Sequence, residues 1–378
     1  MRIRPHHKKV TERQSYDNYW KLTVEYTNIH GERFRDTLKL IVRFMDDNKE
    51  TIDSMDKSIT ALYRELQNNI ASVFSKSDYA SVRKSINQFV KLGFIKPKFR
   101  SYHRLTKRFL NSSTNKEREL IMSEIYYTSA TLGSSVTVDR SDTKEINFLL
   151  KTLMYHPKKK LTENDVISLM NTDVASVSKG YLNEQELAEK YQYAKLTKFD
   201  KKKYNQINYF YKFLSYVPGI SLLDRTIQYT EDASEILAGN IDTKRDQTLF
   251  RIMKENLKEE SKRLYAGKEV CYFTKMQTKG LVASHIWRSE DALREMDVEA
   301  AYDYKNALLL EQSVDAYFDK YDLTFDTNGK ALFGVQVTED FIEKYRDNKL
   351  DKTVLVSERL VYMQKHNISF EKKLSITQ

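Results

Sequence analysis

The sequence has one cysteine, four prolines and ten glycines among 378 residues, and each shortage excludes something. The single thiol, Cys271, excludes an internal disulfide and any zinc site built from several cysteines. No run of eighteen apolar residues occurs, so we expect no transmembrane helix. The basic residues 1–9 are not followed by an apolar signal core, so the expected location is the cytoplasm.

The composition is that of a globular protein with several domains. Hydrophobic residues make up 40% of the chain and charged residues 31%, and the length suits two or three domains. Because glycine and proline are scarce and apolar residues recur at helical spacing, we expect the N-terminal two-thirds to be mostly helical.

The positive charge lies at one end of the chain. The net charge is +10, and residues 1–110 carry 23 lysines and arginines against 12 aspartates and glutamates. A basic block on a folded domain attracts polyanions, because neutralising phosphates releases condensed counterions. This charge distribution favours a nucleic acid as the partner, which the motifs below narrow to double-stranded DNA, and no membrane partner is expected. The alternative is ordinary charge for solubility.

Residues 77–92 have the pattern of a DNA-recognition helix. Ser77 or Asp78 can cap its start, and Gly93 can end it. The basic segment 94–100 is typical of a short strand, and the order helix, helix, strand resembles a winged helix-turn-helix. The expected DNA-binding side chains lie on this helix and strand: Arg83, Lys84, Asn87, Gln88, Lys91, Lys96 and Lys98. The alternative is a solvated helix face in a plain helical domain.

Three segments connect this region to the C-terminal part. Residues 127–144 are rich in serine and threonine and predict a linker or exposed loop. Residues 145–229 predict helices followed by a hairpin at 220–229, which suggests a second unit of winged-helix type. Residues 248–264 alternate in charge, and this pattern predicts a solvated connector helix.

The stretch from residue 270 to residue 319 carries the most specific pattern. His285 closes one apolar run, Asn306 opens the next, and Asp315 and Asp319 lie one helical turn apart on a short amphipathic segment. The motifs are Ala283-Ser-His-Ile286, Asn306-Ala-Leu-Leu-Leu310 and Asp315-Ala-Tyr-Phe-Asp319. In this order they resemble the HNH endonuclease family, and the resemblance covers about residues 265–372.

The resemblance implies a ββα-metal fold and a set of roles. It makes His285 the general base, and Asn306 the residue that ties the loop and holds the imidazole tautomer. It places Mg²⁺ or Mn²⁺ at Asp315, with Asp319 as a second ligand or as an orienting group. Arg288, three residues after the base, is the candidate contact to the scissile phosphate.

Two residues depart from the family pattern. Ser284 stands where many members have an aspartate or histidine that binds metal. Ala307 stands where glycine usually follows the asparagine, so the turn must differ if a positive φ is needed there.

The predicted fold class is α+β, with mostly helical winged-helix-like domains before a C-terminal ββα-metal nuclease. The expected divisions are 1–126 and 127–240 for DNA binding, 241–264 for the connector helix and 265–378 for the HNH domain. The predicted function is a metal-dependent DNA endonuclease of the type II restriction kind, including enzymes that cut outside their recognition site. The alternatives are a DNA-binding regulator with an inactive module and a modification-dependent or phage-defence nuclease. Cutting both strands would need a homodimer or two successive nicks.

Overall fold

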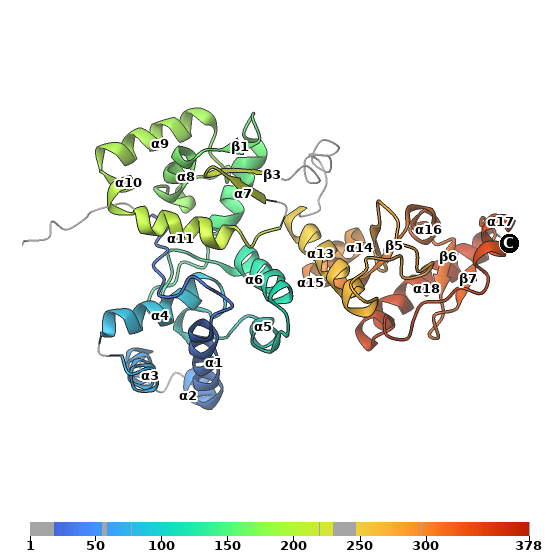
Figure 1. The fold of residues 1–378 in the computed structure, drawn as a ribbon, viewed down its shortest axis with the longest axis horizontal. Helices are drawn as coiled ribbons and strands as arrows, with labels where there is room; N and C mark the ends of the chain where they lie inside the picture. Colours follow the sequence, from blue (N-terminus) through green and yellow to red (C-terminus); the bar gives the residue numbers. More distant parts are fainter. Residues whose placement is uncertain are drawn as a thin grey trace, which may run out of the picture. The chain divides into compact units, whose positions relative to one another are not determined.

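A computed structural model describes residues 19–54, 59–76, 78–218, 220–229, 247–295 and 297–377. The described residues divide into two compact units. The first contains residues 19–106, 125–215 and 221–229, and the second contains residues 107–124, 216–220 and 247–377 (Figure 1). In these residues, no helix combines the length and apolar character needed to cross a membrane. The division predicted from the sequence, into three domains and a connector helix, stays a prediction.

The first unit is mostly helical, as expected. Its α-helices are α1 (Glu32–Asp47), α2 (Lys49–Ser54), α3 (Ile59–Val73), α4 (Tyr79–Lys91), α7 (Glu145–Tyr155), α8 (Glu163–Met170), α9 (Glu184–Leu196), α10 (Phe199–Lys202) and α11 (Tyr204–Leu214). Two 3₁₀ turns, η1 (Pro97–Phe99) and η2 (Val174–Ser176), and three strands, β1 (Lys160–Leu161), β2 (Ile220–Leu223) and β3 (Thr226–Tyr229), complete it.

Helix α4 confirms the helix predicted near residues 77–92. The Asp78 carboxylate accepts hydrogen bonds from the backbone amides of Ala80 and Ser81, at 2.8 and 3.1 Å. Ser77, the other predicted cap, lies outside the described residues. After the helix, Gly93 has φ of +90°, and a Cβ there would lie 2.6 Å from the Ser129 carbonyl carbon. Only glycine fits both requirements.

The strand predicted at residues 94–100 is wrong. This segment forms one isolated bridge, from Ile95 to Tyr102, and then the 3₁₀ turn η1. Pro97 has no N–H to offer to a ladder, and Lys98 and Phe99 have φ of 59° and 53°. An extended strand cannot run through two left-handed residues, so the basic residues here lie on a turn.

The segment predicted as a linker or exposed loop at residues 127–144 is irregular from residue 130 onward, but the prediction that it is exposed is wrong for much of it. Leu132, Val136 and Thr131 are buried, and Thr131 and Val136 are tied to α4 or its side chains by hydrogen bonds. The hydroxyls of this segment bond locally instead of facing water. The Thr143 hydroxyl donates to the Arg140 carbonyl at 2.9 Å. Serine and threonine here satisfy buried backbone groups, a role that composition alone does not distinguish from solvation.

A three-stranded sheet with the order β1-β3-β2 follows α7. Strand β1 pairs antiparallel with β3, with Lys160 opposite Gln228 and Leu161 opposite Ile227. The predicted hairpin at 220–229 is confirmed as β2 and β3. Helix α8 begins at a reciprocal cap between Thr162 and Asp165.

The second unit contains the mixed α+β part. Its α-helices are α13 (Gln247–Leu264), α14 (Ser289–Arg294), α15 (Val298–Tyr302), α16 (Gln312–Phe318), α17 (Glu339–Tyr345) and α18 (Ser357–Thr377). Most of α5 (Thr106–Asn111) and of α6 (Asn115–Ser129) also belongs to this unit, while Thr106 and residues 125–129 belong to the first unit. Its 3₁₀ turn is η3 (Tyr304–Asn306), and its strands are β4 (Val282–His285), β5 (Ala307–Leu310), β6 (Leu323–Phe325) and β7 (Ala331–Phe333).

The helix predicted at residues 248–264 is confirmed as α13, but the prediction that it is solvated is wrong. Met253 and Leu257 are buried in the core that also contains β5, and Glu260 is 3% exposed. The helix packs against β5 and η3. Its alternating charges cover one face while an apolar stripe at i, i+4 spacing enters the core. Residues 241–246 of the predicted connector lie outside the described residues.

The hairpin after the site is confirmed. Strands β6 and β7 pair antiparallel, with Thr324 opposite Leu332, and the Asn328-Gly329 dipeptide forms the turn. Gly329 has φ of +83°, and a Cβ there would lie 2.4 Å from the Leu350 carbonyl oxygen. The C-terminal helix predicted around residues 362–370 is confirmed within the longer α18.

Candidate active site

Two short strands and a helix position the predicted site residues. Strand β4 pairs antiparallel with β5, with Ser284 opposite Leu308 and His285 opposite Ala307. Helix α16 packs against β4. Every residue of β5 is buried, so the register of the pair is fixed by the core on which it lies. The ββα arrangement expected for residues 282–318 is therefore present.

His285 lies at the end of β4, as predicted, and its ring is held on two sides. The side chain is 7% exposed, and the Phe250 ring stacks near it with centroids 6.0 Å apart and an interplanar angle of 19°. Its Nε2 lies 3.1 Å from the Ala301 carbonyl oxygen. A carbonyl oxygen only accepts, so Nε2 carries the proton in the neutral ring. Nδ1 is then the basic atom.

Asn306 links the end of β4 to the segment that orients His285. Its Oδ1 accepts from the Trp287 amide at 2.8 Å, and its Nδ2 donates to the Trp287 and Ala300 carbonyls at 2.8 and 2.9 Å. Ala300 precedes the residue whose carbonyl holds His285. Asn306 is fully buried, so losing these bonds would leave several polar groups unsatisfied.

Ala307 needs no glycine. Its φ and ψ are −149° and 159°, an extended conformation that any residue adopts. An alanine at this position therefore does not disturb the start of β5.

Asp315 and Asp319 lie on and just after α16, one turn apart. The Asp319 amide donates to the Asp315 carbonyl at 2.8 Å. Burial raises the pKa of Asp315, the Ser284 hydroxyl beside it lowers that pKa, and the charge of Asp319 raises it further. Although it faces Asp315, the buried Ser284 hydroxyl makes no hydrogen bond of regular geometry to any described residue. The structure thus brings Ser284, Asp315 and Asp319 together.

Arg288 is exposed, but its guanidinium is already engaged. It donates to the Asp319 carbonyl at 2.6 Å and lies over the Tyr321 ring, 4.6 Å from the centroid. These contacts fix the guanidinium beside the C-terminal end of α16. A phosphate contact there remains a proposal.

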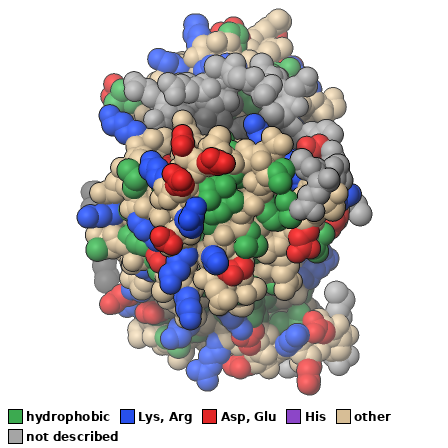
Figure 2. Space-filling view, turned by 90° about the vertical axis from the view of Figure 1, so that its right-hand side faces the viewer, with side chains coloured by type: hydrophobic (Ala, Val, Ile, Leu, Met, Phe, Trp, Pro, Cys, Tyr) green, Lys and Arg blue, Asp and Glu red, His purple; other side chains and the backbone are tan. Residues whose placement is uncertain are grey.

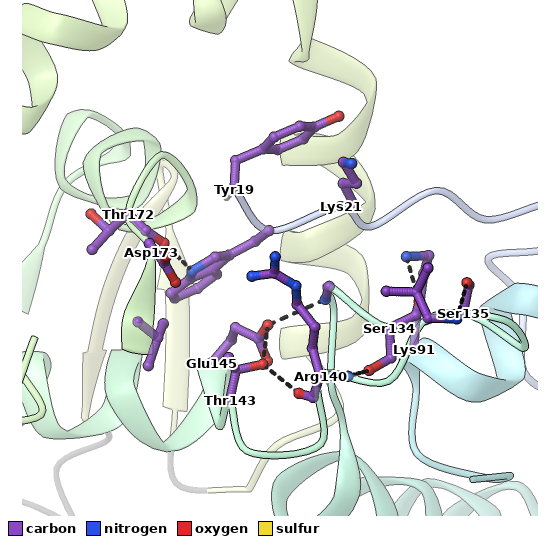
Figure 3. A pocket seen from close by; sticks show the side chains of 14 residues that line it. Tyr19, Lys21, Lys91, Ser134, Ser135, Arg140, Thr143, Glu145, Thr172 and Asp173 are labelled. Atoms are coloured by element: carbon purple, nitrogen blue, oxygen red, sulfur yellow. Dashed lines mark hydrogen bonds between the residues drawn. The ribbon is translucent and has the colours of Figure 1, made fainter. Parts of the chain in front are cut away.

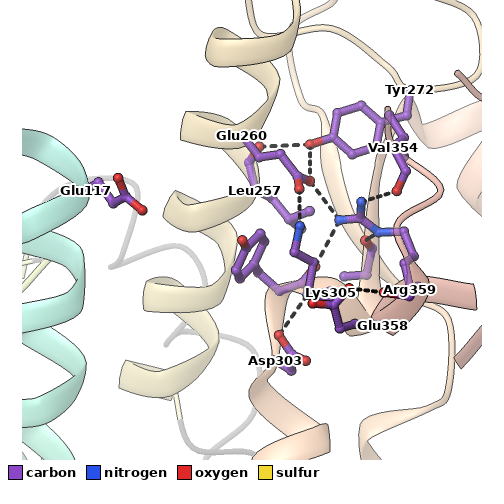
Figure 4. A network of polar contacts seen from close by, with 12 residues as sticks. Glu117, Leu257, Glu260, Tyr272, Asp303, Lys305, Val354, Glu358 and Arg359 are labelled. Carbon is purple, nitrogen blue, oxygen red and sulfur yellow. Dashed lines mark hydrogen bonds and ion pairs between the residues drawn. The ribbon is translucent and has the colours of Figure 1, made fainter. Parts of the chain in front are cut away.

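A buried polar network braces both neighbours of Asn306 (Figure 4). Glu260 accepts from Lys305 at 2.8 Å and from Arg359 at 2.7 Å. Arg359, which is fully buried, also donates to the Ala307 carbonyl at 3.2 Å. Burial alone would raise the pKa of Glu260, but the charges of Arg359 and Lys305 hold it below its ordinary value.

Sequence reasoning missed this network, although a signal was available. Glu260 falls on the buried stripe of α13 with Met253 and Leu257, and Arg359 lies on α18 four residues before the buried Met363. A charged residue on an apolar stripe is rarely left unpaired. Two such residues in one chain predict a buried ion pair.

The site residues supply some of the oxygen ligands that a hydrated divalent cation needs. Asp315 and Asp319 place two carboxylates near each other, and the Ser284 hydroxyl adds an oxygen at the position of the family's other ligand. Within the described ranges, no group of three or more His, Cys, Asp or Glu side chains is arranged to hold a metal ion. Mg²⁺ keeps several waters and needs only one or two protein carboxylates, so this donor set suits it.

The predicted DNA-binding residues on α4 differ in their burial and in their hydrogen bonds. Gln88 is fully buried and its Oε1 accepts from the backbone amides of Glu25 and Tyr26, at 2.8 and 3.0 Å. Lys91 is 5% exposed and donates to two carbonyls of the 132–134 loop. The base contact predicted for Gln88 is wrong, and Lys91 does not lie on an exposed DNA-binding face as predicted, because both side chains are bonded within the unit.

Asn87 also bonds within the unit. Its Oδ1 accepts from the Val136 amide at 2.9 Å and its Nδ2 donates to the Tyr63 hydroxyl at 2.8 Å, so base reading by Asn87 is corrected as well. Arg83 and Lys84 are exposed, and Lys96 and Lys98 are partly exposed on the turn that replaces the predicted strand. The exposed basic set is smaller than the one predicted.

Positively and negatively charged side chains are interspersed on the face shown in Figure 2. Lysine and arginine side chains lie among aspartates and glutamates there, around a small group of hydrophobic side chains. This face therefore has no large area of one charge.

Comparison with known proteins points to the same part of the chain as the geometry. Residues 271–326 match the HNH endonuclease family, a stretch that includes β4, β5, α16 and β6. No curated protein matches the chain. The match supports a nuclease domain of this family in the second unit and implies DNA as its partner.

Proposed function

We propose that this chain is a metal-dependent endonuclease that hydrolyses phosphodiester bonds of double-stranded DNA at specific sites. The observation that carries the proposal is His285 at the end of β4, with its Nε2 engaged by the Ala301 carbonyl. That bond leaves Nδ1 as the basic atom, the protonation state that a general base needs.

In this mechanism each residue has one task. His285 takes a proton from the attacking water at Nδ1. Asn306 acts as a positioning residue, because it holds the segment whose carbonyl fixes the ring. Asp315 and Asp319 would hold Mg²⁺ or Mn²⁺, which supplies positive charge for the phosphate and the leaving oxygen. Arg288 would contact the phosphate at the edge of the site.

The first unit would supply binding to DNA. Its exposed Arg83 and Lys84 suit phosphate contacts, and Lys96 and Lys98 lie on the turn that follows α4. From α7 to β3 the order is helix, strand, four helices with one 3₁₀ turn, and hairpin. The hairpin and the sheet order β1-β3-β2 support a winged-helix assignment for the second DNA-binding part.

Separate reading and cutting parts suit a type II restriction endonuclease acting in the cytoplasm. A homodimer or two successive nicks would then cut both strands.

The test compares wild-type protein with His285→Ala on duplex DNA in Mg²⁺, with RNA of the same sequence as a second substrate. We expect the variant to bind DNA as the wild type does and to cut about 10²–10⁴-fold more slowly. Cleavage by the variant at the wild-type rate would contradict the proposal. Preferential cleavage of RNA would overturn the choice of DNA as substrate.

A further inference from the structure

A cavity of about 250 Å³ lies in the first unit, between the segment at Trp20, the loop after Gly133 and the start of η2 (Figure 3). Its volume falls just below the range of about 300–1,000 Å³ usual for drug-sized ligands. The nuclease mechanism uses none of its residues. Its charged lining consists of three cations and two carboxyl groups, and the excess of positive charge points to an anionic ligand.

Three cations face this space. Lys21 and Arg140 line it, and in Figure 3 the Arg140 side chain extends from its loop into the space below Lys21. Lys91 is the third, and it is 5% exposed. Its Nζ donates to the Leu132 and Ser134 carbonyls at 2.8 and 2.9 Å, which uses two of its three protons.

Lys91 is held in an unfavourable place for a cation. The pKa of Lys91 is lowered to about 8, first by burial and then by the charge of Lys21, against the charge of Glu145, which raises it. A buried ammonium beside a second positive charge gains most from an anion. The carboxyl groups in the lining are Glu145 and Asp173, and the second accepts from the Ala175 amide at 3.3 Å.

Glu145 provides the second observation. It is 3% exposed, and its Oε1 accepts from the Gly133 amide at 3.3 Å and the Thr143 hydroxyl at 3.0 Å. Its Oε2 is buried and makes no hydrogen bond of regular geometry to any described residue, although the backbone amides of Leu132 and of Glu145 itself lie close enough to lower the pKa of the carboxyl. Burial raises the pKa of this carboxyl, and hydrogen bonds from backbone amides and from the Thr143 hydroxyl lower it. A ligand with a polar hydrogen would satisfy Oε2.

We infer that this cavity binds one nucleotide unit, with the phosphate at Lys21, Lys91 and Arg140 and an N–H group of the base at Glu145. The phosphate explains the gathered cations, and the base explains the unsatisfied Oε2. The unit could be a free nucleotide or a nucleotide extruded from a DNA duplex, because both present the same groups. This site is separate from the proposed cleavage chemistry, since binding requires no hydrolysis.

The first experiment is calorimetric titration of the full chain with each deoxynucleoside monophosphate, with 5-methyl-dCMP and with inorganic phosphate. We expect at least one nucleotide to bind tighter than phosphate. Arg140→Gln should weaken the binding of that nucleotide about tenfold or more, because a charge-assisted contact is lost. The variant keeps the backbone bonds of Arg140 to Ser134 and Thr143. Arg64→Gln, on the exposed face of α3, is the matched control and should change nothing.

A second variant separates the base from the phosphate. Glu145→Gln keeps the shape of the side chain but presents an amide, so it should alter the ranking of the bases without weakening phosphate binding. Equal affinity for phosphate and for every nucleotide, in both proteins, would reduce the cavity to a simple anion site and overturn the inference. Unchanged nucleotide binding in Arg140→Gln would place the ligand elsewhere and overturn it too.

The source of the nucleotide is tested with duplex DNA that carries 2-aminopurine at one position, in EDTA so that no cleavage occurs. A fluorescence rise that Arg140→Gln abolishes identifies an extruded nucleotide. Calorimetric binding without a fluorescence change identifies a free nucleotide. Absence of both signals contradicts the inference. None of these readouts depends on nuclease activity, so failure here is distinguishable from failure of the proposed function.

Discussion

Helix α4 in the first unit and the β4–β5–α16 segment in the second both carried predicted functional side chains, with different outcomes. At the second, His285, Asn306 and Asp315 lie on the elements expected for them. On α4, Gln88 and Lys91 lie inside the unit. A motif whose residues come from paired strands and one helix fixes their positions together. A polar helix face does not say which part of it a neighbouring segment will cover.

The largest expected effect comes from Asp315→Ala. Removing the carboxylate that faces Ser284 takes away the main candidate metal ligand. Charge stabilisation by a metal ion contributes several kcal/mol, so we expect cleavage to fall by about 10³-fold or more. Single-turnover cleavage across a range of Mg²⁺ concentrations measures this. A variant with the wild-type rate and metal dependence would contradict the assignment, and the neighbouring Ser313→Ala serves as the control.

Next in size is Glu260→Gln, which tests how the second unit holds its site. Replacing one partner of a buried ion pair leaves Arg359 uncompensated, and we expect a loss of about 3–5 kcal/mol in the free energy of unfolding. Urea unfolding at pH 7 measures it. Arg359→Met combined with Glu260→Gln should recover part of the loss, and a purely additive double variant would contradict the network.

The same carboxyl gives a pH dependence with a definite sign. The pKa of Glu260 in the folded unit is held below the ordinary 4.5, so its contribution to stability is present above pH 4.5 and is lost as the pH falls through the lowered value. Unfolding followed between pH 7 and pH 3 should show this acid loss in the wild type and a smaller one in Glu260→Gln. Identical pH profiles for the two proteins would contradict a lowered pKa at Glu260.

A smaller effect on stability, and none on DNA binding, is expected for Gln88→Ala. The substitution removes the acceptor for the Glu25 and Tyr26 amides, at a cost of about 1–3 kcal/mol. Thermal unfolding and a gel shift at one salt concentration separate the two readouts. A large loss of DNA affinity with unchanged stability would restore Gln88 to the DNA-reading face and remove the contrast between the two regions.

The smallest effect is expected for Arg83→Gln with Lys84→Gln. Both side chains are exposed, so stability should change little. If both contact phosphates, the slope of log Kd against log salt should become shallower by about 2. An unchanged slope would show that this end of α4 does not meet DNA.

The sequence was sufficient where chemistry and spacing agreed. Gly93, Gly329 and Asp78 were assigned to their turns or caps because few other residues fit there. The sequence was insufficient where a segment could either face water or be covered by another part of the chain. The loop at 127–144 and helix α13 were predicted as exposed, and both contribute buried residues, because long-range packing decides which polar groups find partners. The carbonyl of Ala301, which orients His285, carries no side-chain signal.

The most direct test of the central claim is incubation of plasmid DNA with the wild-type protein in Mg²⁺, in Mn²⁺ or in EDTA, using unmodified and methylated plasmid in parallel. If His285 and Asp315 form a hydrolytic site served by a divalent cation, discrete cleavage products will appear with metal and disappear in EDTA. An intact plasmid under every condition, accompanied by a clear gel shift, would contradict that claim and identify a DNA-binding protein that does not cut.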